Sequence, residues 1–339
     1  MCSSDLPGVR LKMELVRRLG VEKCFVVEWP NGCKDANDTL VKFGPAEISR
    51  CMNEAKPVPV SGVFCVNDFC QEIIDAWQYG YERGESTGWD NVDELYKVRV
   101  REWTVVTGIP SHGKSEWLDA LTVNLAVNEG WRFGVCSMEN FPLSRHAAKI
   151  VEKYSGMPFS GTMKYEKIDR ERLDKAIAWM NNHFFFIAPE EDFSVDAILE
   201  KARVLVCRHG INGLILDPWN ELDHSWGAGD TETRYISSQL SKIRRFARNN
   251  GIHVWVVAHP TKLQKNDKGE YPPPTPYDIA GAAHWRNKAD NAITVHRPNM
   301  KEPQNNEVEI HVQKIRFKEI GHVGCAVLRY DWVTGRYNE

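Results

Sequence analysis

The hydrophobic and polar positions of this 339-residue chain follow three successive patterns. Residues 9–19 and 45–55 have the spacing of helices, and residues 24–28 read as a short strand. These elements predict a small α/β fragment that ends near residue 57. Prolines and a glycine then interrupt the pattern, and residues 69–81 predict a lone amphipathic helix whose apolar face needs a partner.

From about residue 87 the pattern changes to strands that alternate with helices. Helical spacing is clearest over 195–209 and 235–250. This alternation predicts an α/β fold built on a mostly parallel sheet. Residues 308–312 and 325–330, by contrast, predict antiparallel edge strands. The strand-like runs of the parallel part are 104–107, 133–137, 185–187, 214–216, 254–258 and 292–296.

The patterns predict three parts, which are a fragment over residues 1–57, a linker with a helix over 58–86, and an α/β domain over 87–339. Residues 1–6 lack the pattern that begins at Pro7, and we set them aside as a non-native leader. No apolar run is long enough to span a bilayer, so no membrane partner is expected.

Charge and cysteine content narrow the function classes. The net charge of −3 gives no global basic signal, so a nucleic-acid site would be local or built by assembly. The nine cysteines include no C-x-x-C pair, which is typical of reduced thiols in a cytosol-like compartment. Cys65 and Cys70 are the closest pair, and without matching His or Cys elsewhere they do not predict a metal site.

The stretch GIPSHGKS fits the phosphate-binding pattern G-x-x-x-x-G-K-S without a mismatch. A strand-like run precedes it and a helical run follows it, which favours a phosphate loop over a chance glycine turn. Lys114 would reach the β- and γ-phosphates of ATP or another nucleoside triphosphate, and the Ser115 hydroxyl would bind Mg²⁺. The expected nucleotide contacts are Gly108, Ile109, Pro110, Ser111, His112, Gly113, Lys114, Ser115 and Glu116.

Three polar residues follow apolar runs at the carboxyl ends of strands, where parallel sheets place ligands. Asp217 would hold Mg²⁺ opposite Ser115, although an Asp before proline also starts turns. Glu139 would orient and deprotonate the attacking water, and we expect its strand beside the phosphate-loop strand. His259 would contact the γ-phosphate. The alternatives are a solvated glutamate and a structural histidine.

Basic residues form further candidate sites. Those on the helix over 235–250 are interpreted as a solvated face with ion pairs. Two loop clusters would contact nucleic-acid phosphates if they line a channel, and exposed loop charge is the alternative. Arg316, near Lys314 on a late strand, would act as an arginine finger in a neighbouring copy, and surface charge is again the alternative. The loop residues are Lys262, Lys265, Arg286 and Lys288.

Six segments occur in order: GIPSHGKSEW, VCSMEN, LILDPWNELDH, VWVVAHPTK, GAAHWRNKADNAITVHR and KIRFKEIG. Together they resemble the helicase domain of the Twinkle-type primase-helicases, within the DnaB-like hexameric helicases. The resemblance covers about residues 62–337. It implies a RecA-like domain in a homo-oligomeric ring of six, which hydrolyses nucleoside triphosphate at subunit interfaces. It also implies movement 5′ to 3′ along single-stranded DNA, with replisome proteins as further partners.

Matching positions in these segments imply residue roles. Glu139 would be the catalytic base, Asp217 the metal residue and His259 the γ-phosphate sensor. Arg316 would be the finger, with Lys314 as its partner cation.

The resemblance also implies contacts at the base and between subunits. Arg297 and Tyr330 match positions that sandwich the nucleotide base, and Arg and Tyr stack well on bases. Asn287 stands where several relatives carry Gln. The helix over 69–81 resembles a linker helix that docks on the adjacent subunit.

The first part of the chain is similar to the second half of a Toprim primase fold, and Lys34, Asp35 and Asn37 match its late motif. Its early glutamate strand is missing, and two-metal chemistry needs such acids, so no primase activity is expected of this chain. We therefore expect an ATP-dependent helicase motor in a bacterial or phage-host cytoplasm, with an organelle left open. The alternative is a non-motor RecA-fold ATPase or NTP switch.

Overall fold

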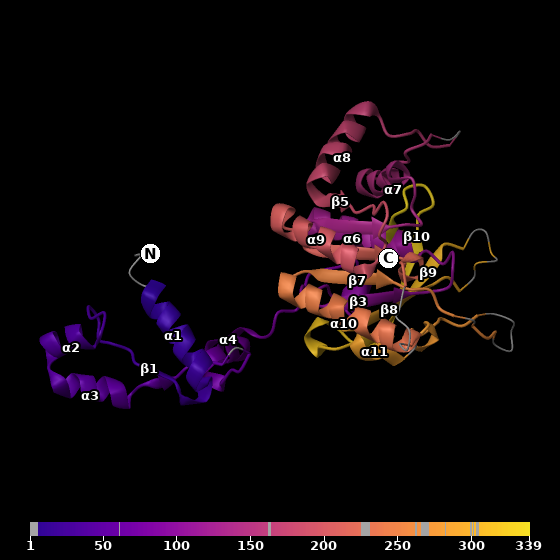
Figure 1. Ribbon diagram of the computed structural model, residues 1–339. Coiled ribbons are helices and arrows are strands. Elements are labelled where there is room, and N and C mark those ends of the chain that lie inside the picture. Colours follow the sequence, from indigo (N-terminus) through magenta and orange to yellow (C-terminus); the bar gives the residue numbers. More distant parts are fainter. Residues whose placement is uncertain are drawn as a thin grey trace. The chain divides into compact units, whose positions relative to one another are not determined.

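The structure is a computed structural model (Figure 1). The chain forms two compact units, Met1–Tyr81 and Glu82–Glu339. None of the described helices combines the length and apolar character needed to cross a bilayer. The residues that the structure describes are 6–60, 62–161, 164–224, 231–261, 263–265, 271–281, 283–298, 300, 302 and 305–339.

The N-terminal unit consists of short helices and one small antiparallel ribbon. Asp35 caps α2, because its carboxylate accepts a hydrogen bond from the backbone N–H of Asp38 at 2.8 Å. This helix was not predicted from the sequence. The elements are α1 (Leu6–Leu19), β1 (Phe25–Val26), α2 (Ala36–Phe43), α3 (Pro45–Asn53), β2 (Lys56–Pro57) and α4 (Cys70–Tyr79).

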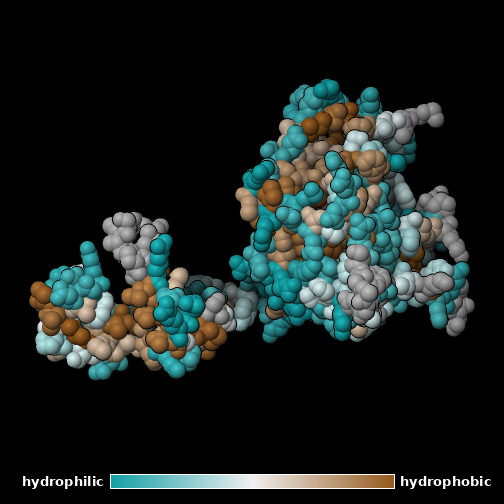
Figure 2. All heavy atoms as spheres, viewed as in Figure 1, coloured by the Kyte–Doolittle hydropathy of each residue, from teal (hydrophilic) through white to brown (hydrophobic). Residues whose placement is uncertain are grey.

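Much of this unit's apolar surface is exposed (Figure 2). Among its described residues, Cys51 is the one buried hydrophobic side chain. The helix predicted over 69–81 is α4, and its Ile73, Ile74 and Trp77 are exposed, the last at 84%. The apolar face of α4 therefore has the character of a contact surface.

The C-terminal unit is built on a nine-stranded sheet in the described residues, with the order β11-β10-β9-β8-β3-β7-β6-β4-β5. The strands from β8 to β5 are parallel, and β9, β10 and β11 continue the sheet antiparallel at one edge. The strands are β3 (Trp103–Thr107), β4 (Phe133–Ser137), β5 (Phe184–Phe186), β6 (Gly213–Asp217), β7 (His253–Val257), β8 (Asn291–His296), β9 (Glu307–Ile315), β10 (Gly324–Tyr330) and β11 (Tyr337–Asn338).

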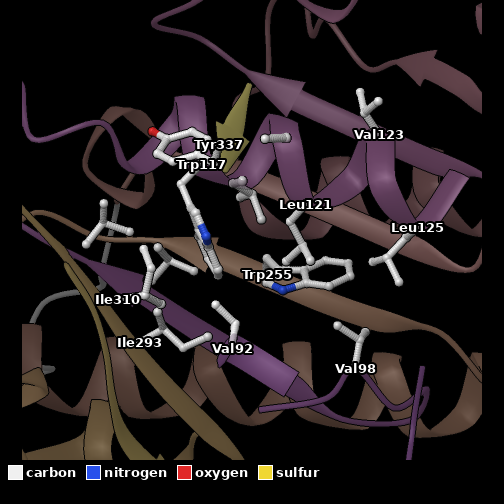
Figure 3. Close-up of a cluster of buried hydrophobic side chains, with 14 of the residues drawn as sticks. Val92, Val98, Trp117, Leu121, Val123, Leu125, Trp255, Ile293, Ile310 and Tyr337 are labelled. Atoms are coloured by element: carbon white, nitrogen blue, oxygen red, sulfur yellow. The ribbon is translucent and has the colours of Figure 1, made fainter. Parts of the chain in front are cut away.

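Helices cover both faces of the parallel part. They are α5 (Asp90–Asp93), α6 (Lys114–Asn128), α7 (Leu143–Ser155), α8 (Arg170–His183), α9 (Val195–His209), α10 (Glu232–Asn250) and α11 (Ala283–Lys288). Side chains alternate along each strand, so neighbouring residues join different cores. On β7, Trp255 packs with Trp117 and Leu121 of α6 (Figure 3), whereas Val256 belongs to the core under α9, α10 and α11.

One expectation about strand order is wrong. The strand that precedes Glu139, β4, is not beside the phosphate-loop strand β3, because β7 and β6 lie between them. The connection through α6 passes over two positions in the sheet, which the later strands β6 and β7 occupy. The hydrophobic pattern gives the order of strands along the chain, not across the sheet. Because all of these strands are parallel, their carboxyl ends still share one edge.

Candidate nucleotide-binding site

The phosphate loop connects β3 to α6 through an unusual backbone. Gly108 has a φ of 153°, and a Cβ there would lie 2.3 Å from the carbonyl oxygen of Val295 on β8, so glycine is required. Gly113 has a φ of 90° and immediately precedes α6. Ser111 has a φ of 68° without being glycine, a conformation that clusters at ligand-binding sites. The loop thus presents the N-terminus of α6, which favours anions.

Lys114 is buried, and its Nζ donates to the carbonyl oxygens of Gly108 at 3.0 Å and Ile109 at 3.3 Å. Burial lowers its pKa, and the carboxylates of Asp217 and Glu139 oppose that shift. The ammonium is thus held at the loop by neutral carbonyl groups. Beside it lies a cavity of about 310 Å³, lined by Ser111, Gly113, Lys114, Ser115, Glu116, Glu139, Asn140 and Lys149.

Asp217 ends β6 and is buried. Its Oδ2 accepts a hydrogen bond from Ser137 at 3.2 Å, and Ser115 also hydrogen-bonds to this carboxyl. Its Oδ1 is buried without a hydrogen-bond partner among the described residues. Burial raises the pKa of Asp217 to about 6, and nearby Asp119 and Glu139 add to the rise. An unpartnered carboxylate oxygen beside a serine hydroxyl fits Mg²⁺, which prefers oxygen ligands.

Glu139 and His259 come from different strand ends and face each other, and Glu139 lines the cavity. The Nε2 atom of His259 lies 3.6 Å from Oε1 of Glu139, whose side chain is 44% exposed. Burial lowers the pKa of His259, and nearby Lys114 adds to this effect. The backbone N–H of His259 donates to Oδ1 of Asn220 at 2.9 Å. The arrangement can hold a water molecule next to a carboxylate base.

A chain of hydrogen bonds that the sequence pattern does not predict supports these groups. Lys149 donates to Asn140 at 3.0 Å, and Asn140 donates to Ser137 at 2.9 Å. Ser137 in turn donates to Asp217. The segment SMEN around Glu139 carries two of these residues, but nothing in the sequence showed that they would connect to β6.

Glu116, expected to contact the nucleotide, is paired within the chain. Its carboxylate lies 2.7 Å from Nζ of Lys149 and 2.5 Å from Nζ of Lys153. Burial raises the pKa of Glu116, but the two lysines outweigh it and lower the pKa to about 2. Glu116 therefore positions two cations beside the cavity.

The two residues expected to hold the base come together around Trp332, which the sequence pattern does not predict as part of this site. The Arg297 guanidinium lies 4.8 Å from the centre of the Trp332 ring, and Tyr330 meets that ring edge-on at 5.0 Å. The backbone N–H of Arg297 donates to Nδ1 of His112 at 2.9 Å, which ties this cluster to the phosphate loop. Trp332 is 57% exposed, so the cluster offers a flat surface for stacking.

Lys314 and Arg316 do not join this site within one chain. Ile315 at the end of β9 pairs with Asn291, the first residue of β8. Lys314 and Arg316 thus lie at the amino ends of the parallel strands, and the phosphate loop lies at the carboxyl ends. A five-residue strand separates the two edges by about 13 Å.

At this amino edge, Asp290 gathers arginine side chains. Its Oδ1 lies 2.7 Å from Nε of Arg316 and 3.2 Å from Nη2 of Arg244. Asp290 is buried. Lys314 donates to the carbonyl oxygen of Ala289 at 2.6 Å. We name Asp290, Arg244, Arg248 and Arg316 the amino-edge cluster.

The candidate DNA contacts have different surroundings. Lys262 lies outside the described residues. Lys265 lies over a tyrosine ring, that of Tyr271. Arg286, on α11, likewise lies over a tyrosine ring. Lys288 donates to Oγ of Ser241 at 2.5 Å, which ties it to α10. The interpretation of the α10 basic residues as an ion-paired face agrees with contacts of Lys242, Arg244 and Arg248 to carboxylates.

Comparisons with known proteins place the chain in a family. The "DnaB-like helicase C terminal domain" family model matches residues 84–337. The "Twinkle homolog protein, chloroplastic/mitochondrial" of Arabidopsis thaliana is 44% identical over 350 residues, covering 99% of this chain and 48% of that protein. A "Primase homolog protein" of Arabidopsis thaliana is 41% identical over 61 residues, covering 16% of this chain and 18% of that protein. The chain thus spans about half or less of these relatives.

Two solved structures share the fold. One, described as an ATPase domain, matches with a TM-score of 0.69 at 18% identity, covering 82% of this chain and 99% of that one. A DnaB-like replicative helicase, whose structure was described with its interactions with primase, matches with a TM-score of 0.66 at 18% identity, covering 99% of this chain and 76% of that one.

These matches define an ATPase domain of the RecA-like type, which confirms the predicted fold class. The chain belongs to the DnaB-like helicase C-terminal domain family. The resemblance to Twinkle-type proteins is confirmed, and the non-motor alternative is not favoured.

Proposed function

We propose that this chain is the motor of an ATP-dependent replicative DNA helicase that moves 5′ to 3′ on single-stranded DNA. ATP is hydrolysed at the interfaces of a six-membered ring of identical subunits. The observation that carries the proposal is the separation of Lys114 and Arg316 on opposite edges of one sheet. Arg316 can therefore reach a phosphate loop only in a second copy.

Each residue at the carboxyl edge has a separate role in ATP hydrolysis. Lys114 binds the β- and γ-phosphates, exchanging its loop carbonyls for charged oxygens. Glu139 accepts a proton from the attacking water, and His259, which faces Glu139, senses the γ-phosphate. Asp217 and Ser115 would hold Mg²⁺, which would neutralise the charge that develops on the phosphate oxygens. Arg316 of the adjacent copy stabilises the same charge from the other side.

The exposed helix α4 supports ring assembly. Its aromatic and aliphatic side chains fit an apolar surface on a neighbouring subunit, as expected for a linker helix. Lys265, Arg286 and Lys288, with Lys262, remain the candidate contacts for DNA phosphates, and replisome proteins remain further candidate partners. The cytoplasmic location also stays a prediction, and the name of the Arabidopsis relative makes plastids and mitochondria the alternative.

Strand displacement on a forked duplex with a 5′ tail tests the proposal. We expect ATP-dependent unwinding and an ATPase rate that rises with single-stranded DNA. Lys114→Ala should lower both about 10²- to 10³-fold, because a charged donor to the transition state is lost. Lys175→Ala, on the exposed face of α8, is the matched control and should behave as wild type.

Two results would contradict the proposal. DNA-stimulated hydrolysis without unwinding on forks of either polarity would favour a non-motor switch. Equal hydrolysis by Lys114→Ala and wild type would place the catalytic site elsewhere.

A further inference from the structure

A group of metal-ligating side chains lies on the antiparallel edge of the sheet, outside the nucleotide site. Strands β9 and β10 are neighbours (Figure 1), and Cys325 on β10 lies directly opposite His311 on β9. Paired residues of an antiparallel ladder project from the same face, with Cβ atoms about 5 Å apart. Glu309, two residues before His311, projects from that face as well.

The ligand atoms of these three residues converge. The Nε2 atom of His311 lies 2.8 Å from Oε2 of Glu309 and 3.8 Å from Sγ of Cys325. All three ligand atoms lie within 4.8 Å of one another. Glu309 and His311 are half-buried, and Cys325 is exposed, so an ion could enter from solvent.

A fourth residue, His296, flanks the group on β8. It is the register partner of Glu309, and its ring centre lies 6.2 Å from that of His311. His296 is 6% exposed, and its Nδ1 is buried without a hydrogen-bond partner among the described residues. A buried, unpartnered imidazole nitrogen beside the cluster is a second, independent sign of a ligand at this place.

We propose that Glu309, His311 and Cys325 form a binding site for a borderline-soft divalent cation, of which Zn²⁺ is the best fit. Thiolate and imidazole ligands favour Zn²⁺ over Mg²⁺ or Ca²⁺, which prefer oxygen. Three protein ligands leave a fourth position open, which water or His296 occupies. Binding displaces the thiol proton of Cys325 to solvent.

The geometry needs little change to accept the ion. In a tetrahedral zinc site the ligand distances imply an N···O separation of about 3.4 Å and an N···S separation of about 3.6 Å. The observed 2.8 Å is about 0.6 Å shorter than the first value, and the observed 3.8 Å is about 0.2 Å longer than the second. The Glu309–His311 hydrogen bond therefore opens slightly, and the Cys325–His311 pair closes slightly.

The position of the site links two parts of the molecule. An ion would clamp β9 to β10, and β9 leads to Arg316 at its end. On the other side, the ring of His296 lies 5.0 Å from the ring of His112 in the phosphate loop. The site thus lies near the phosphate loop, and the strand that carries two of its ligands ends beside Arg316 at the opposite edge of the sheet.

Titration of the reduced 339-residue chain with Co²⁺, a coloured substitute for Zn²⁺, tests the proposal. We expect a thiolate-to-metal charge-transfer band that Zn²⁺ abolishes and excess Mg²⁺ leaves intact. Cys325→Ser should remove the band, and His311→Gln should weaken Zn²⁺ binding by at least about tenfold, no less than the loss of an outer-shell partner costs.

The matched controls are Cys207→Ser, an exposed thiol on α9, and the double variant Cys65→Ser/Cys70→Ser. Both should keep the band. A band that survives Cys325→Ser, disappears with Cys65 and Cys70, or is displaced by Mg²⁺ would overturn the proposal, as would its absence from wild type. Circular dichroism of each variant shows that its fold is intact.

Discussion

The two edges of the central sheet differ in how their polar groups are paired. At the carboxyl edge, one buried oxygen of Asp217 has no hydrogen-bond partner in the described part of the chain, and Lys114 donates to two neutral carbonyls of its own loop. At the amino edge, Asp290 is surrounded by three guanidinium groups. The first edge is built to receive a charged ligand, and the second holds cations in place by internal contacts. Incomplete pairing thus marks a binding site better than the number of charges does.

The largest expected effect on ATP hydrolysis comes from variants that disable one edge of the sheet in one subunit and the other edge in its neighbour. Arg316→Ala should lower kcat for ATP about 10³- to 10⁵-fold, the range for loss of an arginine finger. Glu139→Gln should also be inactive. Mixed in one ring, the two variants form some interfaces with an intact Glu139 and an intact Arg316, so activity should return. Steady-state ATPase assays across mixing ratios measure this rescue.

Arg329→Ala on β10 is the control for the loss of an exposed arginine. When Arg329→Ala is mixed with Glu139→Gln, the ATPase activity should equal that of the sites whose Glu139 comes from Arg329→Ala subunits, with no recovery beyond it. Failure of the Arg316→Ala and Glu139→Gln mixture to recover activity, under conditions where mixed rings form, would argue against catalysis between subunits.

The amino-edge cluster itself gives the next largest effect. Asp290→Ala leaves three neighbouring guanidinium groups without their shared carboxylate. We expect a loss of about 2–4 kcal/mol in the free energy of unfolding, less than for a fully buried pair because the arginines are partly exposed. Urea denaturation measures it. Asp174→Ala, which breaks an exposed ion pair on α8, should lower the free energy of unfolding by less than about 1 kcal/mol. Equal losses for Asp290→Ala and Asp174→Ala would contradict the claim that the buried carboxylate contributes more.

The smallest effect concerns pH and the amino end of β7. Complete burial lowers the pKa of His253 to about 4, although its hydrogen bond to the Arg99 carbonyl opposes the shift. Below the unfolded value of 6.5 the unfolded chain takes up a proton that the folded chain does not. Stability is therefore lost as the pH falls from about 6.5 towards 4, by about 2 kcal/mol at pH 5.

His253→Gln should remove this part of the pH dependence, as measured by urea denaturation at neutral pH and at pH 5. His322→Gln, at an exposed position, is the control and should keep the slope of wild type. A His253→Gln protein with the same slope as wild type would show that this imidazole does not sense pH.

The elements around the phosphate site could be predicted because their signals are local. Strand, glycine loop and helix follow one another in sequence around Lys114, and Asp217 and His259 each end an apolar run. The position of β4 in the sheet could not be predicted, because long helical connections carry no signal for the strands that they cross. Glu139 reaches the cavity in spite of that error, since parallel strands share a carboxyl edge.

Contacts between distant segments could not be predicted from the sequence. Arg316 was singled out, but its partner Asp290 was not, because the two meet only after β8 and β9 pair antiparallel. Trp332 was missed for the same reason, since its role depends on Arg297 from another strand.

The placement of Lys114 and Arg316 on opposite edges also bears on the symmetry of an assembly in which they meet. A twofold-symmetric dimer buries the same patch of both partners, so it would need one patch that spans both edges to pair Arg316 with Lys114. A head-to-tail contact needs only one edge from each copy, and it leaves a free edge at each end. Such a row of subunits closes into a ring when its rotation allows and otherwise continues as a filament, so the sheet's own direction favours an assembly in which every subunit points the same way.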